Sequence, residues 1–468
     1  MSNNIGLNGY KVVDVIEEEH SVLIYVQPEK ETRKCPNCGS GNCYVKDKKE
    51  RFYRDVEFMG KHAEVAIVSK RFICNDCNNT FYSEITYMDN TFKMTTRLKK
   101  RIREEGFLNT FTALSLRYGV DEKTIRNVFK EYSEELDKDW KILAPEVLGI
   151  DECHLANYAR SVFVDVKKKN SRLIEMAKDS KKVTVEKVLN SMHNPDNTKV
   201  VTMDMTNTYK HAVQYVLPNA TIVIDKFHVL QTVVGATSDS FKLVRSKMEE
   251  SFESLPKEDR IEIRKRYKSL KISVNMFRSN IEDLNAWQRS CLAEAVRIYP
   301  DFAKVMTLKE NFRGMMNKPK NREEAEKKFI QWEKDIPEEN EFEPFRDAAK
   351  TVNNWHNEIF NYFDYRESNG PVEALNGVVK ILNRNGRGYS YEVIRAKALY
   401  RTITPQVPKY SRPISKPGVF ECLYSFAGPK LIEGSGVDID RLYAALNRTT
   451  AKTPRKDSET EQINFSDF

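Results

Sequence analysis

Two pairs of cysteines near the amino terminus constrain the fold of this chain more than any other feature. Cys35 and Cys38 form the first pair, and Cys74 and Cys77 form the second. Each C-x-x-C spacing makes a tight knuckle, and two knuckles carried together on strands offer four thiolates to one tetrahedral Zn²⁺. Such a site replaces the hydrophobic core that a small module cannot build. We therefore predict a zinc-ribbon-like module over residues 1–90 with one structural Zn²⁺.

Two other residues are alternative ligands for this metal. Cys43 and His62 lie between the two cysteine pairs, and either could replace one thiolate. The alternative without a metal is a set of four reduced cysteines that share no role. A site closed by four protein ligands has no open position for a substrate, so we assign it no catalytic role.

Positive charge gathers in two parts of the chain. Residues 91–130 carry ten Lys and Arg residues against four acidic ones, and residues 376–412 carry eight against one. Clustered positive charge indicates nucleic-acid binding because it neutralises phosphates, although charge runs are also typical of solvated helical faces. No apolar run reaches the ~18 residues that a membrane span needs, so we expect no membrane partner and a cytoplasmic protein.

Residues 111–129 have the pattern of a helix-turn-helix, which we place in a DNA-binding domain over residues 91–140. Gly119 permits the turn, and Asp121 can cap the second helix. The small core is predicted from four apolar residues: Ala113, Leu116, Ile125 and Val128. The second helix would present side chains that suit phosphates and base edges: Lys123, Arg126, Asn127 and Lys130. An ordinary helical hairpin is the alternative.

Strands and helices alternate over residues 145–231. Apolar runs predict strands at residues 147–151, 161–166, 172–177, 199–203 and 221–224, and helices at residues 183–192 and 209–216. The order β-β-β-α-β-α-β is that of the ribonuclease-H-like fold. The predicted fold class is therefore multidomain α+β, with a zinc-ribbon-like module, a helix-turn-helix and a ribonuclease-H-like α/β catalytic core.

An all-helical insertion over residues 232–362 would interrupt this core. Three tryptophans in it, Trp287, Trp332 and Trp355, are predicted to anchor the packing between helices. Residues 363–404 would form the second part of the core. Residues 405–468, rich in Pro, Ser and charge, would form a C-terminal extension that is partly disordered.

Three carboxylates occupy places that suit phosphodiester chemistry. Two divalent cations about 3.5–4 Å apart can activate an attacking oxygen and stabilise a leaving one, and carboxylates from different elements must converge to hold them. Asp151 and Asp204 each follow an apolar strand, and these two strands are neighbours in a ribonuclease-H-like sheet. Glu373 lies near the start of a later helix. We predict that Asp151, Asp204 and Glu373 hold two Mg²⁺ (or Mn²⁺) ions.

The predicted helix of Glu373 begins near Pro371 and has two faces. Glu373, Asn376 and Lys380 fall on one of them, which would suit a metal and the DNA backbone. The other face would pack against the core. Three basic residues of this segment would neutralise phosphates near the cut: Lys380, Arg384 and Arg387.

Other polar residues compete for roles at this site. Glu152 follows Asp151, but strand alternation should turn it away. Asp225 ends the strand after that of Asp204, and we favour Asp204 as the metal ligand. Asp225 and His228, together with Asn376, are candidates for supporting the ligands or facing DNA. An ordinary structural histidine is the alternative for His228, and His154 is too isolated for an assignment.

Several motifs, together with the paired cysteines, occur in one known family. They are Gly-Ile-Asp-Glu at residues 149–152, Asp-Lys-Phe-His at residues 225–228 and Ser-Asn-Gly-Pro-Val-Glu-Ala-Leu-Asn at residues 368–376. From about residue 30 to about residue 402, the chain resembles bacterial insertion-sequence transposases of the ISL-three family. It departs from the family at Ala374, where members often have Gly, and in a longer tail after Pro405.

The resemblance implies a DDE transposase that binds terminal inverted repeats, cuts DNA at the transposon end and joins the 3′-hydroxyl to target DNA. It also implies a helical insertion before the glutamate. Asp204 and Glu373 are 169 positions apart (373 − 204), whereas a strand, a helix and loops need roughly 30–40 residues. Pairing of two ends implies at least a dimer, working on the bacterial nucleoid.

Two other functions remain open at the level of the sequence. A catalytically silent regulator derived from a transposase would bind DNA without cutting it, although three intact acids argue against this. A metal-dependent nuclease would hydrolyse DNA without joining it, although separate DNA-binding modules are not typical of a general nuclease.

Overall fold

The computed structural model describes residues 6–30, 33–155, 158–166 and 171–401. The chain divides into two compact units, Met1–Pro405 and Gln406–Phe468, and the described residues all belong to the first. The predicted C-terminal extension of residues 405–468 therefore lies outside the described residues, as do positions 402–404. No helix in the described ranges is long and apolar enough to cross a membrane.

A seven-stranded sheet forms the amino-terminal part of the chain. Its strands are β1 (Tyr10–Glu17), β2 (Ser21–Pro28), β3 (Cys43–Phe58), β4 (Lys61–Cys74), β5 (Thr80–Tyr82), β6 (Met88–Asp89) and β7 (Met94–Thr95). Their order is β1-β2-β4-β3-β7-β6, and β5 pairs with β4. The long antiparallel hairpin β3–β4 brings Cys43 opposite Cys74 at its open end, beside the two cysteine knuckles. The hairpin thereby brings residues far apart in the sequence to one place.

Three helices follow this sheet: α1 (Thr96–Glu105), α2 (Phe111–Tyr118) and α3 (Glu122–Asp139). Gly119 has φ +59°, in the left-handed region that a glycine enters at little cost, and so ends α2. The side chain of Asp121 accepts hydrogen bonds from two backbone N–H groups at the start of α3. These two residues therefore have the local roles that the sequence predicts for them.

The two residues of α2 that the sequence predicts for this core are wrong. Ala113 and Leu116 are exposed, and Leu116 retains 74% of its accessible surface. The buried residues of α2 are instead Phe111, Leu114 and Tyr118, which pack with Ile125, Val128 and Phe129 of α3. Both sets have helical spacing, and the larger side chains fill the core.

A five-stranded sheet of order β10-β9-β8-β11-β12 occupies the middle of the chain. Its elements are β8 (Val147–Leu155), β9 (Tyr158–Asp165), β10 (Arg172–Met176), α4 (Lys182–Asn190), β11 (Val200–Met203), α5 (Asn207–Val216) and β12 (Thr221–Ile224). The strand β9 runs antiparallel to both β8 and β10, whereas β11 runs parallel to β8 and to β12. The observed order of elements matches the predicted one.

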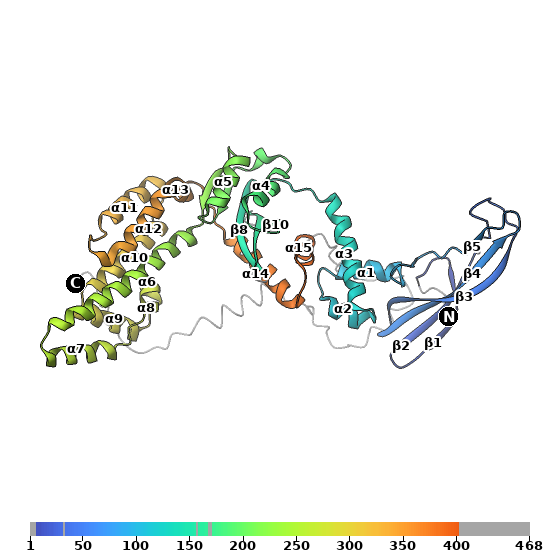
Figure 1. Ribbon diagram of the computed structural model, residues 1–468, viewed down its shortest axis with the longest axis horizontal. Helices are drawn as coiled ribbons and strands as arrows, with labels where there is room; N and C mark the ends of the chain where they lie inside the picture. The colour runs from blue at the N-terminus through green and yellow to red at the C-terminus, as the bar shows by residue number, and fades with distance from the viewer. Residues whose placement is uncertain (1–5, 31–32, 156–157, 167–170, 402–468) are drawn as a thin grey trace, which may run out of the picture. The chain divides into compact units, whose positions relative to one another are not determined.

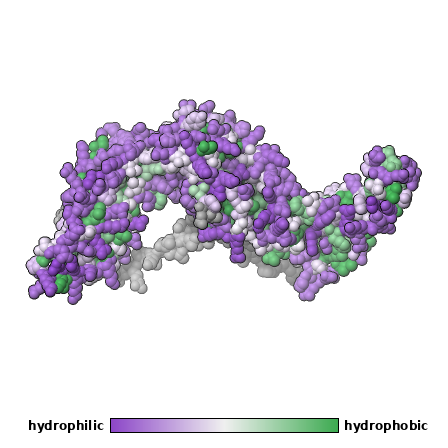
Figure 2. All heavy atoms as spheres, viewed as in Figure 1, coloured by the Kyte–Doolittle hydropathy of each residue, from purple (hydrophilic) through white to green (hydrophobic). Residues whose placement is uncertain are grey.

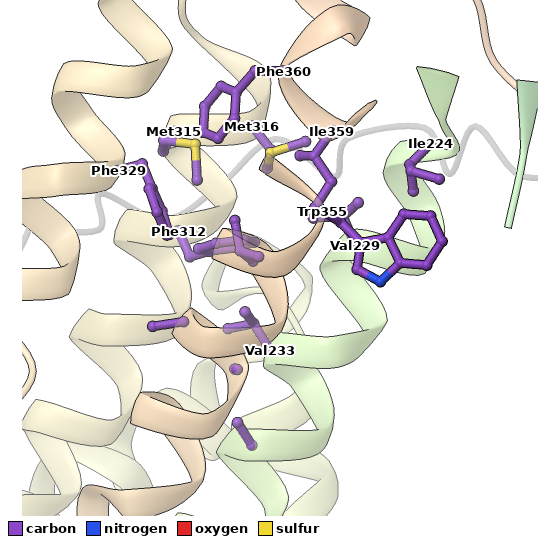
Figure 3. Packing of buried hydrophobic residues seen from close by; sticks show 14 of the residues in the cluster. Ile224, Val229, Val233, Phe312, Met315, Met316, Phe329, Trp355, Ile359 and Phe360 are labelled. Carbon is purple, nitrogen blue, oxygen red and sulfur yellow. The ribbon is translucent and has the colours of Figure 1, made fainter. Parts of the chain in front are cut away.

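Eight α-helices of the described chain then form a helical region (Figure 1): α6 (Lys226–Ser251), α7 (Lys257–Ser269), α8 (Val274–Arg278), α9 (Ala286–Ile298), α10 (Asp301–Asn317), α11 (Arg322–Lys334), α12 (Glu343–Asn354) and α13 (His356–Tyr365). The helix α6 begins directly after β12 and runs through the predicted boundary at residues 231 and 232. One buried apolar cluster extends from the sheet into these helices. In Figure 3, Trp355 lies beside Ile224 of β12.

The predicted roles of the tryptophans hold for two of three. Trp332 and Trp355 are buried, at 2% and 8% of their accessible surface. Trp287 is wrong as an anchor because 54% of it is exposed. It lies in the first turn of α9, ahead of the residues that this helix buries. Hydrophilic residues dominate the visible surface in Figure 2, as expected for a chain with 31% charged residues.

The last two helices of the described chain, α14 (Gly370–Gly386) and α15 (Tyr391–Tyr400), return to the five-stranded sheet. In Figure 1, α14 lies beside β8. The close approach depends on Gly149 of β8. A Cβ atom there would lie 2.4 Å from Cγ2 of Val372 and 2.7 Å from Cγ2 of Val166. The first turns of α14 therefore reach the sheet because one strand residue has no side chain.

We expect Gly149→Ala to lower the free energy of unfolding by about 1–3 kcal/mol, the usual cost of overpacking a core. The added methyl group must push α14 away from β8. Thermal denaturation of the variant beside wild type measures this cost. Gly377, where an added Cβ meets nothing within 4 Å, provides the matched control Gly377→Ala. Equal stability of the two variants would contradict the close packing.

Candidate active site

Three aspartates lie at the same level on three neighbouring strands. Ile150 of β8 pairs with Met203 of β11, and Met203 pairs with Ile224 of β12. The next residue of each chain segment is an aspartate: Asp151, Asp204 and Asp225. Because the three strands are parallel, the register alone brings these carboxylates to one edge of the sheet.

Asp151 is the most constrained carboxylate of this edge. It is 8% exposed, and its Oδ1 accepts a hydrogen bond from the backbone N of Glu152 at 2.7 Å. Its Oδ2 accepts one from Nδ2 of Asn376 at 2.8 Å. Burial and the neighbouring charge of Asp204 raise the pKa of Asp151 to about 7. A divalent cation would remove the cost of ionising this group.

A histidine lies between the other two aspartates. Nδ1 of His228 is 2.9 Å from Oδ1 of Asp204 and 3.4 Å from Oδ2 of Asp225. These two carboxylates raise the pKa of His228 to about 10, so the imidazole carries a positive charge at neutral pH. Burial acts to raise the pKa of Asp225, but His228 and two backbone N–H groups lower it overall. The oxygens of Asp225 are therefore largely engaged.

Asn376 and Glu373 do not share a face in the way the sequence suggests. Asn376 is 4% exposed and faces the sheet with Val372 and Val379, whereas Glu373 and Lys380 are exposed. The reason is close packing, because α14 buries the face with Val372, Asn376 and Val379, and Val372 meets Gly149 of β8. Asn376 therefore contacts Asp151 directly, and only its predicted place on one face with Glu373 and Lys380 is wrong.

The three predicted metal ligands do not converge on one point in this structure. In the described part of the chain, only the cysteine quartet brings three or more ligand atoms within 4.8 Å of one another. The Glu373 side chain makes no hydrogen bond or ion pair with any described residue. It lies one helical turn before Asn376, which bonds Asp151. Like charges repel one another unless a cation lies among them.

A cleft of about 450 Å³ opens beside Asp204. Its walls include Glu152, Tyr209 and His228. Glu152 points to the opposite side of β8 from Asp151, as strand alternation requires, and Oε1 lies 2.9 Å from Nε2 of His154. The sequence predicts no role for Glu152 or His154 at the site. The cleft places Glu152 near Asp204 because the loop after β11 and the start of α6 close around that side of the sheet.

The predicted DNA-binding residues are all exposed: Lys123, Arg126, Asn127, Lys130, Lys380, Arg384 and Arg387. Two of them have acidic neighbours on the same helix. Arg126 lies 2.9 Å from Glu122, and Lys130 lies 3.8 Å from Glu134. Exposed pairs of this kind contribute little stability, so these side chains can exchange such neighbours for phosphates.

Four thiols meet at the open end of the β3–β4 hairpin. The Sγ atoms of Cys35 and Cys77 are 3.5 Å apart, as are those of Cys38 and Cys74. All four lie within 4.8 Å of one another. Tetrahedral Zn²⁺ with Zn–S bonds of ~2.3 Å needs S–S distances of ~3.8 Å, so this donor set fits the metal.

Neither alternative zinc ligand belongs to this set. Cys43 lies opposite Cys74 in the hairpin, and its thiol contacts the carbonyl oxygen of Ser40 at 3.6 Å. Nε2 of His62 lies 2.9 Å from the carbonyl oxygen of Leu116 at the end of α2. The quartet of the two C-x-x-C pairs is thus the donor set that fits one Zn²⁺.

We expect Asp151→Asn to stabilise the metal-free chain at high pH. In the fold the pKa is about 7, above the ordinary value of about 3.9, so the folded state holds the proton longer. The free energy of unfolding therefore falls as pH rises from about 4 to about 7, and the cost is complete above pH 7. The Oδ1 atom of Asn376 has no partner in the described structure and can accept from the new amide.

The gain should be on the order of 1–3 kcal/mol at pH 8 and should vanish near pH 4. Thermal denaturation in the presence of a chelator, repeated across this pH range, measures it. The control is Asp165→Asn on β9, a buried carboxylate outside this edge. A melting temperature below that of wild type at pH 8 would contradict the raised pKa.

Two family models and a curated relative match parts of this chain. Residues 148–398 match the family model of ISL3 transposases of the DDE type, and residues 31–77 match that of the zinc-finger of transposase IS204/IS1001/IS1096/IS1165. The transposase for insertion sequence element IS1001 of Bordetella parapertussis is 22% identical over 232 residues. That match covers 48% of this chain and 57% of the relative, so the chain spans little more than half of that protein's length. Because the first model alone covers more than half of its residues, the chain belongs to the ISL3 family of transposases.

Proposed function

We propose that this chain is a DDE transposase that binds terminal inverted repeats, cuts DNA at the transposon end and transfers the 3′-hydroxyl to target DNA. Asp151, Asp204 and Glu373 would hold two Mg²⁺ (or Mn²⁺) ions. The observation that carries the proposal is the shared register of two neighbouring parallel strands: Asp151, within β8, lies level with Asp204, the first residue after β11. The bond from Asn376 to Asp151 supports Glu373 as the third ligand, because Glu373 lies one helical turn before Asn376 on α14.

The fold around the acids supports a ribonuclease-H-like core. Three antiparallel strands followed by two parallel ones, with the order β10-β9-β8-β11-β12, are the arrangement that such a core requires. We propose the domain division that follows from it: residues 1–90, 91–140, 145–231, 232–362 and 363–404. The helices α1, α2 and α3 would act as the helix-turn-helix unit, with the exposed side of α3 toward DNA.

The donor set suits hard divalent cations, which prefer carboxylate oxygens. When bound, the two cations would activate an attacking oxygen and stabilise the leaving one. The protein's own residues would orient the ligands and neutralise the DNA backbone. Asp151 is oriented by the backbone N of Glu152 and by Asn376, and the cationic His228 holds Asp204. Exposed Lys380 and Arg384 on α14 would neutralise the DNA backbone near the cut.

Asp204 is the better ligand of the two candidate aspartates. Asp225 accepts hydrogen bonds from the backbone N of Phe227 at 3.1 Å and of Asn369 at 3.1 Å, and it also faces His228. Among the described residues, only His228 forms an ion pair with Asp204, which lies next to Asp151 and lines the cleft. We therefore assign Asp225 and His228 a supporting role.

The partners would be the terminal inverted repeats and target DNA. Six exposed polar or basic side chains of α3 and α14, together with Arg387 just after α14, would contact them, so binding should weaken as the salt concentration rises. Two ends must be held together for strand transfer, so the working form would be at least a dimer. The place of action would be the nucleoid of a bacterial cell.

The test is a joining assay with the full chain. Labelled duplexes that carry the inverted repeats flanking its gene are incubated with a target plasmid and Mg²⁺ or Mn²⁺. A transposase releases the 3′ end and gives labelled plasmid. Cleavage of any duplex without joining would instead identify a nuclease. Tight binding of the repeats without cleavage in either metal would identify a catalytically silent DNA-binding regulator.

A further inference from the structure

Asn369 connects all three strands that carry the aspartates. Its Nδ2 donates to the carbonyl oxygen of Ile150 at 3.2 Å, and its Oδ1 accepts from Oγ1 of Thr202 at 2.7 Å. Its backbone N donates to Oδ1 of Asp225 at 3.1 Å. The residue is 0% exposed. Asp225 is itself one of the three aspartates. Ile150 directly precedes Asp151, and Thr202 lies two residues before Asp204.

The same residue also begins the helix that carries Glu373. The backbone oxygen of Asn369 accepts from the backbone N of Val372 at 2.8 Å and of Glu373 at 3.0 Å. One side chain and one peptide unit therefore join β8, β11 and the end of β12 to the first turn of α14. The partners are 219, 167 and 144 positions away in the sequence.

We propose that Asn369 is a positioning residue that fixes the distances among Asp151, Asp204 and Glu373. The proposal rests on the function proposed above. Between β12 and Asn369 the chain passes through the helices α6 to α13, so Asn369 is the point at which this region returns to the sheet. Apolar packing by Val372 and Val379 can hold α14 on the sheet, but it is less directional than hydrogen bonds.

The amide side chain of Asn369 suits its position between β8 and β11. It donates to one strand and accepts from another at the same time, which neither a carboxylate nor an aliphatic side chain can do. Thr202 is also 0% exposed, so loss of Oδ1 would leave a buried hydroxyl without its acceptor. Metal sites need their ligands within ~0.5 Å of the productive geometry, and the supporting groups set that precision.

The experiment measures metal binding rather than activity alone. Asn369→Ala and Asn369→Asp are compared with wild type by Mn²⁺ titration with EPR detection, by thermal denaturation and by binding of inverted-repeat DNA. Both variants should bind DNA within about twofold of wild type. Their affinity for Mn²⁺ should fall by about 10–100-fold, the usual effect of removing a group that supports metal ligands. Cleavage at saturating Mn²⁺ should fall by about 100-fold.

A matched control lies at the opposite end of the same sheet. Thr198, shortly before β11, is 3% exposed, and its Oγ1 donates to the carbonyl oxygen of Pro145 at 2.8 Å. Thr198→Val should lower the melting temperature but leave Mn²⁺ affinity unchanged. Equal Mn²⁺ affinity in the Asn369 variants and Thr198→Val would overturn the proposal, because a merely structural residue affects stability alone.

A milder variant keeps the test decisive if the Asn369 variants fail to fold. Thr202→Val removes one hydrogen bond to Asn369 and makes the same chemical change as Thr198→Val on the same segment. Thr202→Val should weaken Mn²⁺ binding severalfold more than Thr198→Val, and equal effects would overturn the proposal. Failure of the proposed function gives a different result: wild type and Asp204→Asn would then bind Mn²⁺ alike.

Discussion

Asp204→Asn should lower the rate of DNA cleavage and joining by at least about a thousandfold, while the chain stays folded and bound to end DNA. A thousandfold loss equals about 4 kcal/mol of transition-state stabilisation, which is in the range that a catalytic metal supplies. The amide keeps the shape of the side chain but removes the charge that a divalent cation needs. The measurement is single-turnover cleavage of a labelled transposon end in Mg²⁺, with DNA binding measured in parallel.

Asp225→Asn is the matched variant, because the two aspartates occupy the same level of adjacent strands and both face His228. The single amide oxygen can still accept the backbone N–H bond from Phe227 at the start of α6, although the backbone N–H of Asn369 then loses its acceptor, and we expect the fold to persist. We expect this variant to keep measurable activity. If Asp225→Asn is inactive and Asp204→Asn is active, then Asp225 is the second metal ligand and our assignment is reversed.

Removal of zinc should unfold the amino-terminal module and abolish specific binding of the inverted repeats. Zinc binding by such cysteine sets contributes on the order of 10 kcal/mol of folding free energy. The two knuckles lie at the open end of the β3–β4 hairpin, so their release would leave its strands without a closing contact. A chelator or Cys74→Ser should therefore expose residues 33–90 to protease. Metal analysis should find one Zn²⁺ per wild-type chain.

Cys43→Ser is the control for this experiment. Cys43 pairs with Cys74 across the hairpin but does not belong to the quartet. This variant should keep its zinc, its protease resistance and its DNA binding. Loss of zinc from Cys43→Ser to the same extent as from Cys74→Ser would mean that Cys43 is a ligand. Protease resistance that persists without zinc would contradict a structural role for the metal.

Local patterns were sufficient for several parts of this protein. The C-x-x-C spacing identified the four thiols, because the knuckle is a property of four consecutive residues. Apolar runs identified β11, which ends before Asp204, and the first part of β8, which continues through Asp151 to Leu155. The cap residue Asp121 identified the start of α3. Each of these features depends on neighbours in the sequence, whose geometry the backbone itself limits.

Such patterns therefore predict the order of elements over residues 145–231 and the ends of β11 and β12, but not the end of β8. Which face of a helix is buried depends on packing between distant parts of the chain. Periodicity groups Phe111 with Leu114 and Ala113 with Leu116 equally well, and packing selects the first pair. Tertiary contacts also explain Asn376, which reaches Asp151 because Gly149 lets α14 approach β8 closely. They explain Asn369 as well, whose hydrogen-bond partners lie more than a hundred positions away. Hydrogen bonds between distant residues leave no periodic trace in a single sequence, so only the folded chain shows them.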